Sequence, residues 1–239
     1  KVITQVFSNL SAEDIRGSVD AFEKAINQAQ IIMFPGGFSA GDEPDGSAKF
    51  FATAFQNEKV KEAVMKLLNE RDGLALGICN GFQIITAAGI LPGALIANES
   101  ARFTCRWVDL EVKGQSPWLA DIERLSLPIA HGEGQYVDTE KNLDALEKAG
   151  GLALTYVSGE MCAYQDLAAN PNGAMRDIAG ITARDGRVFG LMPHPERGSF
   201  FEQRPDWTVK REEYERAGKK PPVYADGIEV FRNAVKYFA

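Results

Sequence analysis

A buried strand, a sharp turn and a helix are predicted by Leu74-Ala-Leu-Gly-Ile-Cys-Asn-Gly-Phe-Gln83 in this 239-residue chain. Residues 74–78 form a short, continuous apolar run, which is typical of a strand covered on both faces. A helix of mostly small and apolar residues is predicted at 81–88, so Cys79 stands at the strand-to-helix turn. The segment Gly77-Ile-Cys-Asn-Gly81 has G-x-C-x-G spacing, the cysteine form of a nucleophile elbow. Its glycines suit a turn so tight that a larger residue would clash with neighbouring elements.

Strands and helices are predicted to alternate before this turn. Ser11-Ala-Glu-Asp14 resembles a capping box that opens a helix. The apolar run Ile31–Phe34 is a second strand expected to be buried on both faces. The expected elements are strands at 2–7, 31–34 and 74–78, and helices that begin near residues 11, 60 and 81. This alternation favours an α/β fold with an open, mostly parallel, twisted sheet and helices on both faces.

The second half of the chain is predicted to extend the same domain. Strands are expected at 102–112 and 125–129, in a part of the sheet that could be antiparallel, before a helix at 142–148. An Asp185-Gly186 turn separates two apolar runs within Ile181–Met192, and this pattern predicts a hairpin. The charged segment 202–220 is expected to be a solvated loop with a short helix, or an insertion that faces a partner. With a closing helix at 227–238 and no linker, one domain over residues 1–239 is the simplest organisation.

The composition excludes several classes of function. A net charge of -7 without clustered Lys and Arg does not fit nucleic-acid binding. No apolar run approaches the roughly 18 to 20 residues of a membrane-spanning helix, and the first residues lack a signal-peptide hydrophobic region. The three cysteines show neither CxxC spacing nor an even number, which fits a reducing compartment. We expect a soluble, cytoplasmic protein in which Cys105 and Cys162 are inert buried residues.

Cys79 is the candidate nucleophile. A helix that begins just after it points unpaired backbone N–H groups at the sulfur, and this field lowers a thiol pKa from its usual value of about 8.5. The N–H of Asn80 is positioned to donate to an oxyanion, and a second donor is expected from the Gly36-Gly37 loop. Each feature also has a purely structural interpretation, the first as a turn and the second as a loop. Predicted to lie side by side, they favour an oxyanion hole.

The chain has only two histidines, so the candidates for a general base are few. His194 lies between two prolines after a predicted strand, and Glu196, two positions on, could fix its tautomer. Together with Cys79 they give a Cys–His–Glu arrangement. The alternative is an ordinary rigid strand exit, with Glu196 paired to Arg197 or solvent. His131 could line a pocket or sit in a turn, and two histidines without paired cysteines do not make a zinc site.

Four segments together resemble the class I glutamine amidotransferases. They are Pro35-Gly-Gly-Phe-Ser39 with Gly41-Asp42, Gly77-Ile-Cys-Asn-Gly-Phe-Gln83, His131-Gly-Glu-Gly134 and Pro193-His-Pro-Glu-Arg197. More narrowly, they are similar to the glutaminase part of phosphoribosylformylglycinamidine synthases, which act in purine biosynthesis. The resemblance runs from about Ile31 to the end of the chain. It implies a flavodoxin-like amidotransferase fold and the hydrolysis of glutamine.

The resemblance also implies roles for individual residues. Cys79 would be the nucleophile, His194 the base and acid, and Glu196 the residue that orients it. The remaining site residues would be Gly37 and Asn80 in the oxyanion hole, and Gly36, Phe38, Gln83 and His131 in the glutamine pocket. The ammonia would pass to a synthetase domain or subunit, which uses ATP and Mg²⁺ with formylglycinamide ribonucleotide. No cofactor or metal is expected in this chain.

The sequence departs from the family pattern at three places. Gln135 stands where the family usually has an arginine, which affects local contacts without touching the triad. The loop Gly41-Asp-Glu-Pro-Asp-Gly46 is one of several variants. Residues 1–7 look like the second strand of the family, so we expect a piece of a longer chain that lacks the first strand–helix unit.

Two other functions fit parts of the sequence. A cysteine peptidase or related hydrolase on a similar α/β fold would also need an activated Cys79. A non-enzymatic docking or regulatory module of a synthetase would follow if the missing first strand left the sheet edge exposed or the domain poorly assembled. Ammonia release from glutamine separates the first alternative from an amidotransferase, and labelling of Cys79 by a glutamine analogue separates the second.

Overall fold

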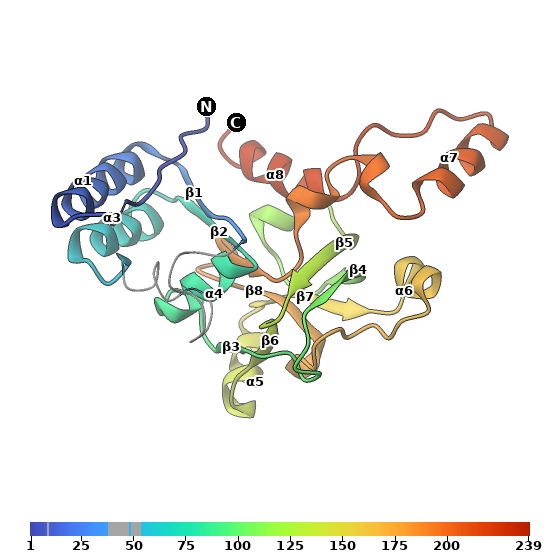
Figure 1. Cartoon of the computed structure of the whole chain (residues 1–239), viewed down its shortest axis with the longest axis horizontal. Helices are drawn as coiled ribbons and strands as arrows, with labels where there is room; N and C mark the ends of the chain where they lie inside the picture. Colours follow the sequence, from blue (N-terminus) through green and yellow to red (C-terminus); the bar gives the residue numbers. More distant parts are fainter. Residues whose placement is uncertain (9, 38–47, 49–53) are drawn as a thin grey trace.

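The computed structural model describes residues 1–8, 10–37, 48 and 54–239, which surround one curled seven-stranded sheet (Figure 1). In spatial order the strands are β1 (Ile31–Phe34), β2 (Leu74–Ile78), β9 (Val188–Leu191), β8 (Ile178–Ala183), β7 (Leu152–Val157), β4 (Thr104–Val112) and β5 (Arg124–His131). Two short strands, β3 (Ala94–Ile96) and β6 (Gln135–Val137), form a separate antiparallel pair. The α/β class predicted from the alternating elements is therefore confirmed.

Helices cover this sheet and extend from it. The α-helices are α1 (Ala12–Gln28), α3 (Glu58–Asn69), α4 (Asn80–Ala87), α5 (Glu140–Lys148), α6 (Glu160–Gln165), α7 (Trp207–Arg216) and α8 (Gly227–Lys236). Short 3₁₀ turns are η1 (Pro117–Leu119), η2 (Met175–Asp177), η3 (Pro195–Gly198) and η4 (Phe201–Gln203). Helices α3 and α4 pack against β2, and α8 packs against β5 and η3. Figure 1 shows α7 standing away from the sheet, as the solvated helix predicted for this charged segment should.

The parallel part of the sheet is narrower than the alternating pattern predicts. β1 pairs in parallel with β2, and β2 in parallel with β9, whereas the remaining pairs in this sheet are antiparallel. The reason lies in the connections, because a parallel pair needs a long crossover and an antiparallel pair can use a short turn. The segment holding α3 makes such a crossover between β1 and β2. Residues 184–187 form the predicted tight turn between β8 and β9.

The first residues contradict one prediction. Residues 1–8 form no strand, and Val2 and Val6 are 90% and 73% exposed. β1 was expected to be buried on both faces, but it lies at the edge of the sheet, and Met33 is 40% exposed. A strand is stabilised by a partner on each side, and in the described residues β1 is paired only with β2. Ser11 is confirmed as the N-cap of α1, because the N–H of Asp14 donates to its Oγ at 3.1 Å. The Asp14 carboxylate accepts from the Ser11 hydroxyl at 2.6 Å, in place of the bond to the Ser11 backbone N–H that a full capping box has.

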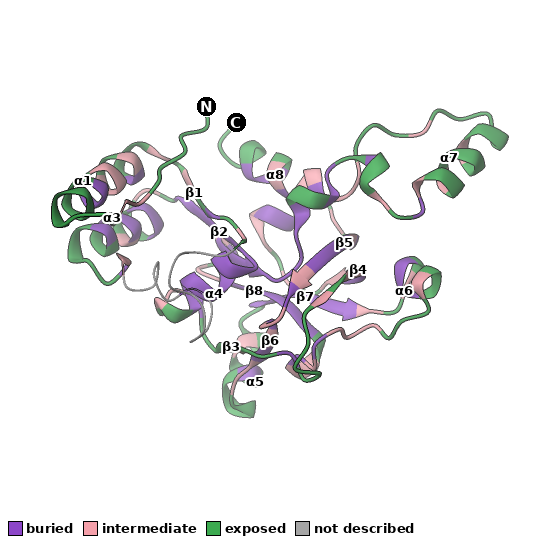
Figure 2. Ribbon diagram, viewed as in Figure 1, coloured by how far each residue is buried: buried purple, intermediate pink, exposed green. Residues whose placement is uncertain are grey.

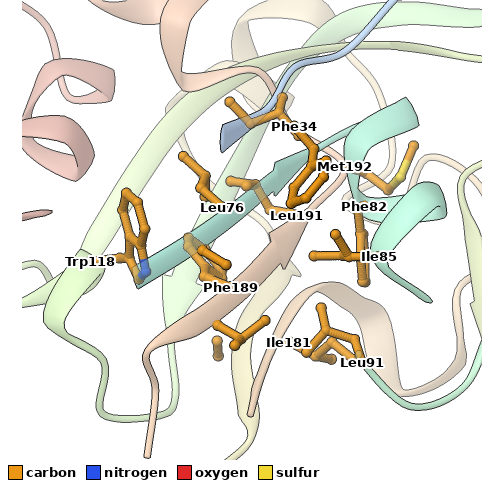
Figure 3. Packing of buried hydrophobic residues seen from close by; sticks show 14 of the residues in the cluster. Phe34, Leu76, Phe82, Ile85, Leu91, Trp118, Ile181, Phe189, Leu191 and Met192 are labelled. Carbon is orange, nitrogen blue, oxygen red and sulfur yellow. The ribbon is translucent and has the colours of Figure 1, made fainter. Parts of the chain in front are cut away.

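The hydrophobic core lies directly under the Cys79 turn. Figure 2 shows the burial concentrated in the strands and in the inner faces of the helices, and Figure 3 shows side chains of β2, β9 and α4 meeting in one cluster. Phe82, in the first turn of α4, is fully buried and stacks on Tyr136 with 6.2 Å between ring centroids. Burying such a side chain contributes about 1.5–3 kcal/mol. The start of α4 is therefore rigidly attached to the sheet.

Several elements were missing from the sequence prediction. They are β7, α6 and the pair β3–β6. Gly150-Gly151 and Ser158-Gly159 flank β7, so its turn signals were present in the sequence but were not used. The predicted helices at 142–148 and 227–238 are confirmed as α5 and α8, and the predicted strands at 102–112 and 125–129 as β4 and β5. None of the helices in the described ranges is both long enough and apolar enough to cross a membrane.

Candidate active site

Cys79 lies on the strained turn that its flanking glycines predict. Its backbone has φ 52° and ψ -109°, between the end of β2 and the start of α4. A positive φ is uncommon for a residue with a Cβ and costs on the order of 1–3 kcal/mol, so surrounding contacts must hold it. The N–H of Cys79 donates to the Leu191 carbonyl at 2.8 Å, and its own carbonyl accepts from Phe82 and Gln83 at 2.9 and 3.1 Å. The turn is therefore fixed from both sides.

The glycines at this turn have no room for a side chain. A Cβ on Gly77 would lie 2.7 Å from the Gly81 carbonyl oxygen, and one on Gly81 would overlap the Phe34 carbonyl. Gly36 is equally confined, because its Cβ would lie 2.7 Å from Cε1 of His194 and 3.3 Å from Cβ of Cys79. The backbone of the Gly36 loop thus passes directly over the predicted nucleophile and base.

His194 is held in one orientation by two contacts. Its backbone N–H donates to the Pro128 carbonyl at 2.8 Å, which anchors the residue to β5. Its Nδ1 donates to Oε1 of Glu196 at 2.7 Å. Glu196 therefore pairs with His194, as the Cys–His–Glu arrangement predicts, and not only with Arg197 or solvent. Because Nδ1 is occupied by this carboxylate, Nε2 is the nitrogen left to exchange a proton. Nε2 is buried and makes no other hydrogen bond within the described part of the chain.

Cys79 and His194 interact electrostatically. Burial lowers the pKa of His194, but the Cys79 side chain and the Glu196 carboxylate raise it more strongly, so that the pKa is about 9. The imidazolium is therefore favoured at neutral pH whenever Cys79 is a thiolate. Cys79 is 8% exposed, and its thiol contacts the Ala130 carbonyl at 3.8 Å. A buried cysteine beside an imidazolium that a carboxylate orients is an arrangement that can support nucleophilic catalysis.

The turn at His131–Gly134 lies beside this pair. His131 is only 3% exposed, and burial lowers its pKa to about 4, with the nearby His194 adding to the effect. The side-chain amide of Gln83, in the first turn of α4, donates to the Glu133 carbonyl at 2.7 Å. Gln83 and His131, both predicted to line a glutamine pocket, are therefore joined through the backbone of one turn. His131 is both a turn residue and a neighbour of the candidate base.

The structure leaves the other predicted site residues less defined. Asn80 begins α4 and is 5% exposed, and Gly37 has φ 108°, a conformation that favours glycine. Their roles in an oxyanion hole stay predictions. Phe38 and the Gly41–Gly46 loop lie outside the described residues.

Three buried polar residues near the site were not found from the sequence. Asn98 contacts the ring of His131, and Asn172 donates to the Gly134 carbonyl at 2.7 Å. Tyr156 lies close enough to Cys79 for an electrostatic interaction. Burial, with a smaller contribution from Cys79, raises the pKa of Tyr156 well above its usual range. Neither a motif nor a fixed spacing identifies these residues, because each reaches the site from a different segment.

The two other cysteines, Cys105 and Cys162, lie in different environments, and within the described residues neither belongs to a metal-binding cluster. Cys162 is buried as predicted, but Cys105, the second residue of β4, is exposed, which contradicts the prediction. Among the residues that the structure describes, no group of three or more His, Cys, Asp or Glu side chains could hold a metal ion.

Comparisons with known proteins agree with this geometry. Residues 1–238 match the family described as the CobB/CobQ-like glutamine amidotransferase domain. The chain is 39% identical to phosphoribosylformylglycinamidine synthase subunit PurQ of Methanococcus maripaludis strain C7 over 231 residues, or 91% of this chain and 84% of that protein. It is 37% identical to the same subunit of Aquifex aeolicus over 181 residues, or 74% and 76%. The structure of PurLQS from Thermotoga maritima matches with a TM-score of 0.61 and 34% identity, over 88% of this chain and 80% of that one.

Proposed function

This chain belongs to the CobB/CobQ-like glutamine amidotransferase family, and we propose that it is the glutaminase subunit of a phosphoribosylformylglycinamidine synthase. The observation that carries the proposal is the strained Cys79 turn facing His194, whose Nδ1 donates to Glu196 at 2.7 Å. The length of the sequence match supports the narrower assignment to this synthase, because the PurQ subunit of M. maripaludis is matched over 91% of this chain. The reaction would supply ammonia for purine biosynthesis.

Catalysis begins when the Cys79 thiolate attacks the carboxamide carbon of glutamine. The carbonyl oxygen becomes an oxyanion, and the backbone N–H groups of Gly37 and Asn80 donate to it. The His194 imidazolium gives its proton to the amide nitrogen, the carbon–nitrogen bond breaks, and ammonia leaves a glutamyl thioester on Cys79. Glu196 keeps the imidazole oriented and stabilises its positive charge during this step.

The thioester is then hydrolysed. Neutral His194 takes a proton from a water molecule as the water attacks the thioester carbon, and the same oxyanion donors act again. Collapse of the tetrahedral intermediate breaks the carbon–sulfur bond, releases glutamate and restores the thiolate–imidazolium pair. Gly36, Phe38, Gln83 and His131 contribute to the glutamine pocket. Gly36 lies close to both catalytic side chains, because a Cβ on it would be 2.7 Å from Cε1 of His194 and 3.3 Å from Cβ of Cys79.

The ammonia is used at a second site on a synthetase partner. There, ATP and Mg²⁺ drive the conversion of formylglycinamide ribonucleotide to formylglycinamidine ribonucleotide, and this chain itself needs no cofactor. Residues 1–239 form a glutaminase domain that supplies the ammonia, with glutamine as the nitrogen donor, in the cytoplasm.

Glutamate release from glutamine tests the proposal, with this chain alone and together with its synthetase. Cys79→Ala should abolish release, whereas the matched variant Cys105→Ala should retain it, because Cys105 is exposed on β4. In the complete enzyme, Cys79→Ala should still allow synthesis from added ammonia. Peptide cleavage without glutamate release would instead support a cysteine peptidase. No labelling of Cys79 by a glutamine analogue, with no release beside the synthetase, would support a docking module.

A further inference from the structure

Asn98 is a buried amide at the back of the His131–Gly134 turn. It lies between β3 and β4 and is 2% exposed. Its Nδ2 is 2.9 Å from the carbonyl oxygens of both Arg102 and His131. Its Oδ1 is 3.0 Å from the N–H of Gly134 and 3.0 Å from Nδ1 of His131. A single side chain thus contacts the backbone of this turn at both ends and the imidazole ring between them.

These contacts determine which way the amide faces. Carbonyl oxygens only accept, so the atom facing Arg102 and the His131 backbone must be the amino group. The N–H of Gly134 only donates, so the atom facing it must be the oxygen. The same oxygen faces Nδ1 of His131, and an oxygen without a proton can only accept there. Nδ1 of His131 therefore carries the proton.

The second ring nitrogen is then an acceptor. Neutral histidine has one protonated nitrogen, and burial of His131 opposes the addition of a second proton. Nε2 of His131 is buried and, within the described residues, has no hydrogen-bond partner. A buried acceptor without a donor is costly, so its retention next to a catalytic pair indicates a donor that arrives with the ligand.

We propose that Asn98 is a positioning residue that fixes His131 as its Nδ1–H tautomer, so that Nε2 accepts a hydrogen bond from an N–H group of glutamine. The inference rests on the proposed glutaminase function for the identity of the ligand, but the tautomer is a property of the free protein. Asn98 would act through His131 and through the Gly134 backbone, without contacting the substrate.

Asn172 provides a matched comparison, because it holds the same turn without touching the ring. Its amide donates to the Gly134 carbonyl at 2.7 Å, and its oxygen accepts from Ala174 at 3.0 Å. Loss of Asn172 should loosen the turn and leave the bond between Asn98 and His131 in place. A general effect of turn packing can therefore be separated from a specific effect on the tautomer.

Nitrogen NMR of the histidine rings tests the tautomer directly. The chain has two histidines, so a histidine-labelled sample gives few signals, and His131→Gln assigns them. Between pH 6 and 8, about the physiological range in which histidines usually titrate, Nδ1 of His131 should be protonated and Nε2 bare. Asn172→Ala should give the same pattern. A protonated Nε2 in the wild-type protein would overturn the proposal, whatever the protein does with glutamine.

Kinetics of Asn98→Asp test the consequence for the substrate. The carboxylate loses the two hydrogen bonds of Nδ2 to the carbonyls of Arg102 and His131, a loosening of the turn for which Asn172→Ala is the comparison. Its oxygen beside Nδ1 stabilises the imidazolium, which removes the acceptor at Nε2. KM for glutamine should rise about tenfold, the effect of one lost hydrogen bond, with a smaller change in kcat. The increase should diminish at higher pH, as His131 loses its second proton, whereas any increase in Asn172→Ala should not depend on pH. A KM profile parallel to that of the wild type would refute the role of Asn98. Absence of glutaminase activity in the wild type would instead refute the proposed function and leave the NMR result standing.

Discussion

Replacing Glu196 by glutamine tests the assigned base and its orienter with little change in shape. The 2.7 Å contact between Nδ1 of His194 and Oε1 of Glu196 has the length of a charge-assisted hydrogen bond. Such bonds contribute about 1.5–3 kcal/mol, and each 1.36 kcal/mol changes a rate tenfold. If the full free energy of this hydrogen bond stabilises the charged His194 in the transition state, its loss should lower kcat/KM for glutamine about 10- to 150-fold.

The same substitution should change the pH dependence in a defined direction. His194 has a pKa of about 9, and the Glu196 carboxylate is one of the groups that raise it. Since activity requires the imidazolium as proton donor, the wild-type rate should fall as pH rises through that value. Removing the negative charge lowers the pKa of His194, so the decline of the Glu196→Gln variant should begin at lower pH.

Steady-state glutamate release across this pH range measures both effects. Glu202→Gln is the matched control, because Glu202 is an exposed glutamate in the following turn and its substitution should leave rate and profile unchanged. If kcat/KM of Glu196→Gln is within twofold of the wild-type value and the rate declines at the same alkaline pH, Glu196 does not orient His194 and belongs only to the rigid segment that follows β9.

Three other substitutions follow from the same contacts. Gly36→Ala places a Cβ 2.7 Å from Cε1 of His194, so kcat/KM should fall at least about tenfold, and the thermal midpoint should also fall, because overpacking a confined position typically costs about 1–3 kcal/mol. Phe82→Ala empties a fully buried position and should cost about 3–5 kcal/mol in urea unfolding, whereas Phe200→Ala, at a half-exposed ring, should cost much less. The folded-state pKa of His131 is about 4, below the ordinary 6.5, so the unfolded chain binds more protons between these values. Folding should therefore lose up to about 3 kcal/mol as pH falls from 6.5 to 4, and His131→Gln should remove this loss in pH-dependent urea unfolding.

The nucleophile turn could be predicted from sequence because its determinants are local. Gly77, Cys79 and Gly81 lie within one short segment, and an apolar strand before them with a helix after them is enough to define the turn. The glycine requirement is confirmed by the missing space at both positions. The hairpin of β8 and β9 was equally accessible, because its turn and both apolar runs are contiguous.

The edge of the sheet could not be read in the same way. An apolar run such as Ile31–Phe34 has the same composition in a central strand and in an edge strand, and only the presence of a neighbour decides its burial. Residues 1–8 show the same limit, because an extended apolar pattern forms a strand only where another strand accepts its hydrogen bonds. The antiparallel half likewise depends on how long each connection is and where it leads, which propensity does not encode.

The polar support of the site depends on contacts between distant segments. Asn98 and His131 are 33 positions apart, and Asn172 reaches the same turn from 38 positions beyond Gly134. No local pattern distinguishes these asparagines from residues that favour ordinary turns. Their function becomes visible only through their burial and through the donors and acceptors that face them.

The strain at Cys79 connects the stability of the fold to its chemistry. A positive φ costs on the order of 1–3 kcal/mol, and the turn would relax if α4 could move away from the sheet. Phe82 prevents this movement, because its ring is fully buried one turn after the nucleophile and contributes a comparable free energy. The bond from Cys79 to the Leu191 carbonyl joins the same turn to β9, the strand that leads to His194. The relative position of Cys79 and His194, the proposed nucleophile and base, is therefore set by core packing on one side and by the parallel pair β2–β9 on the other.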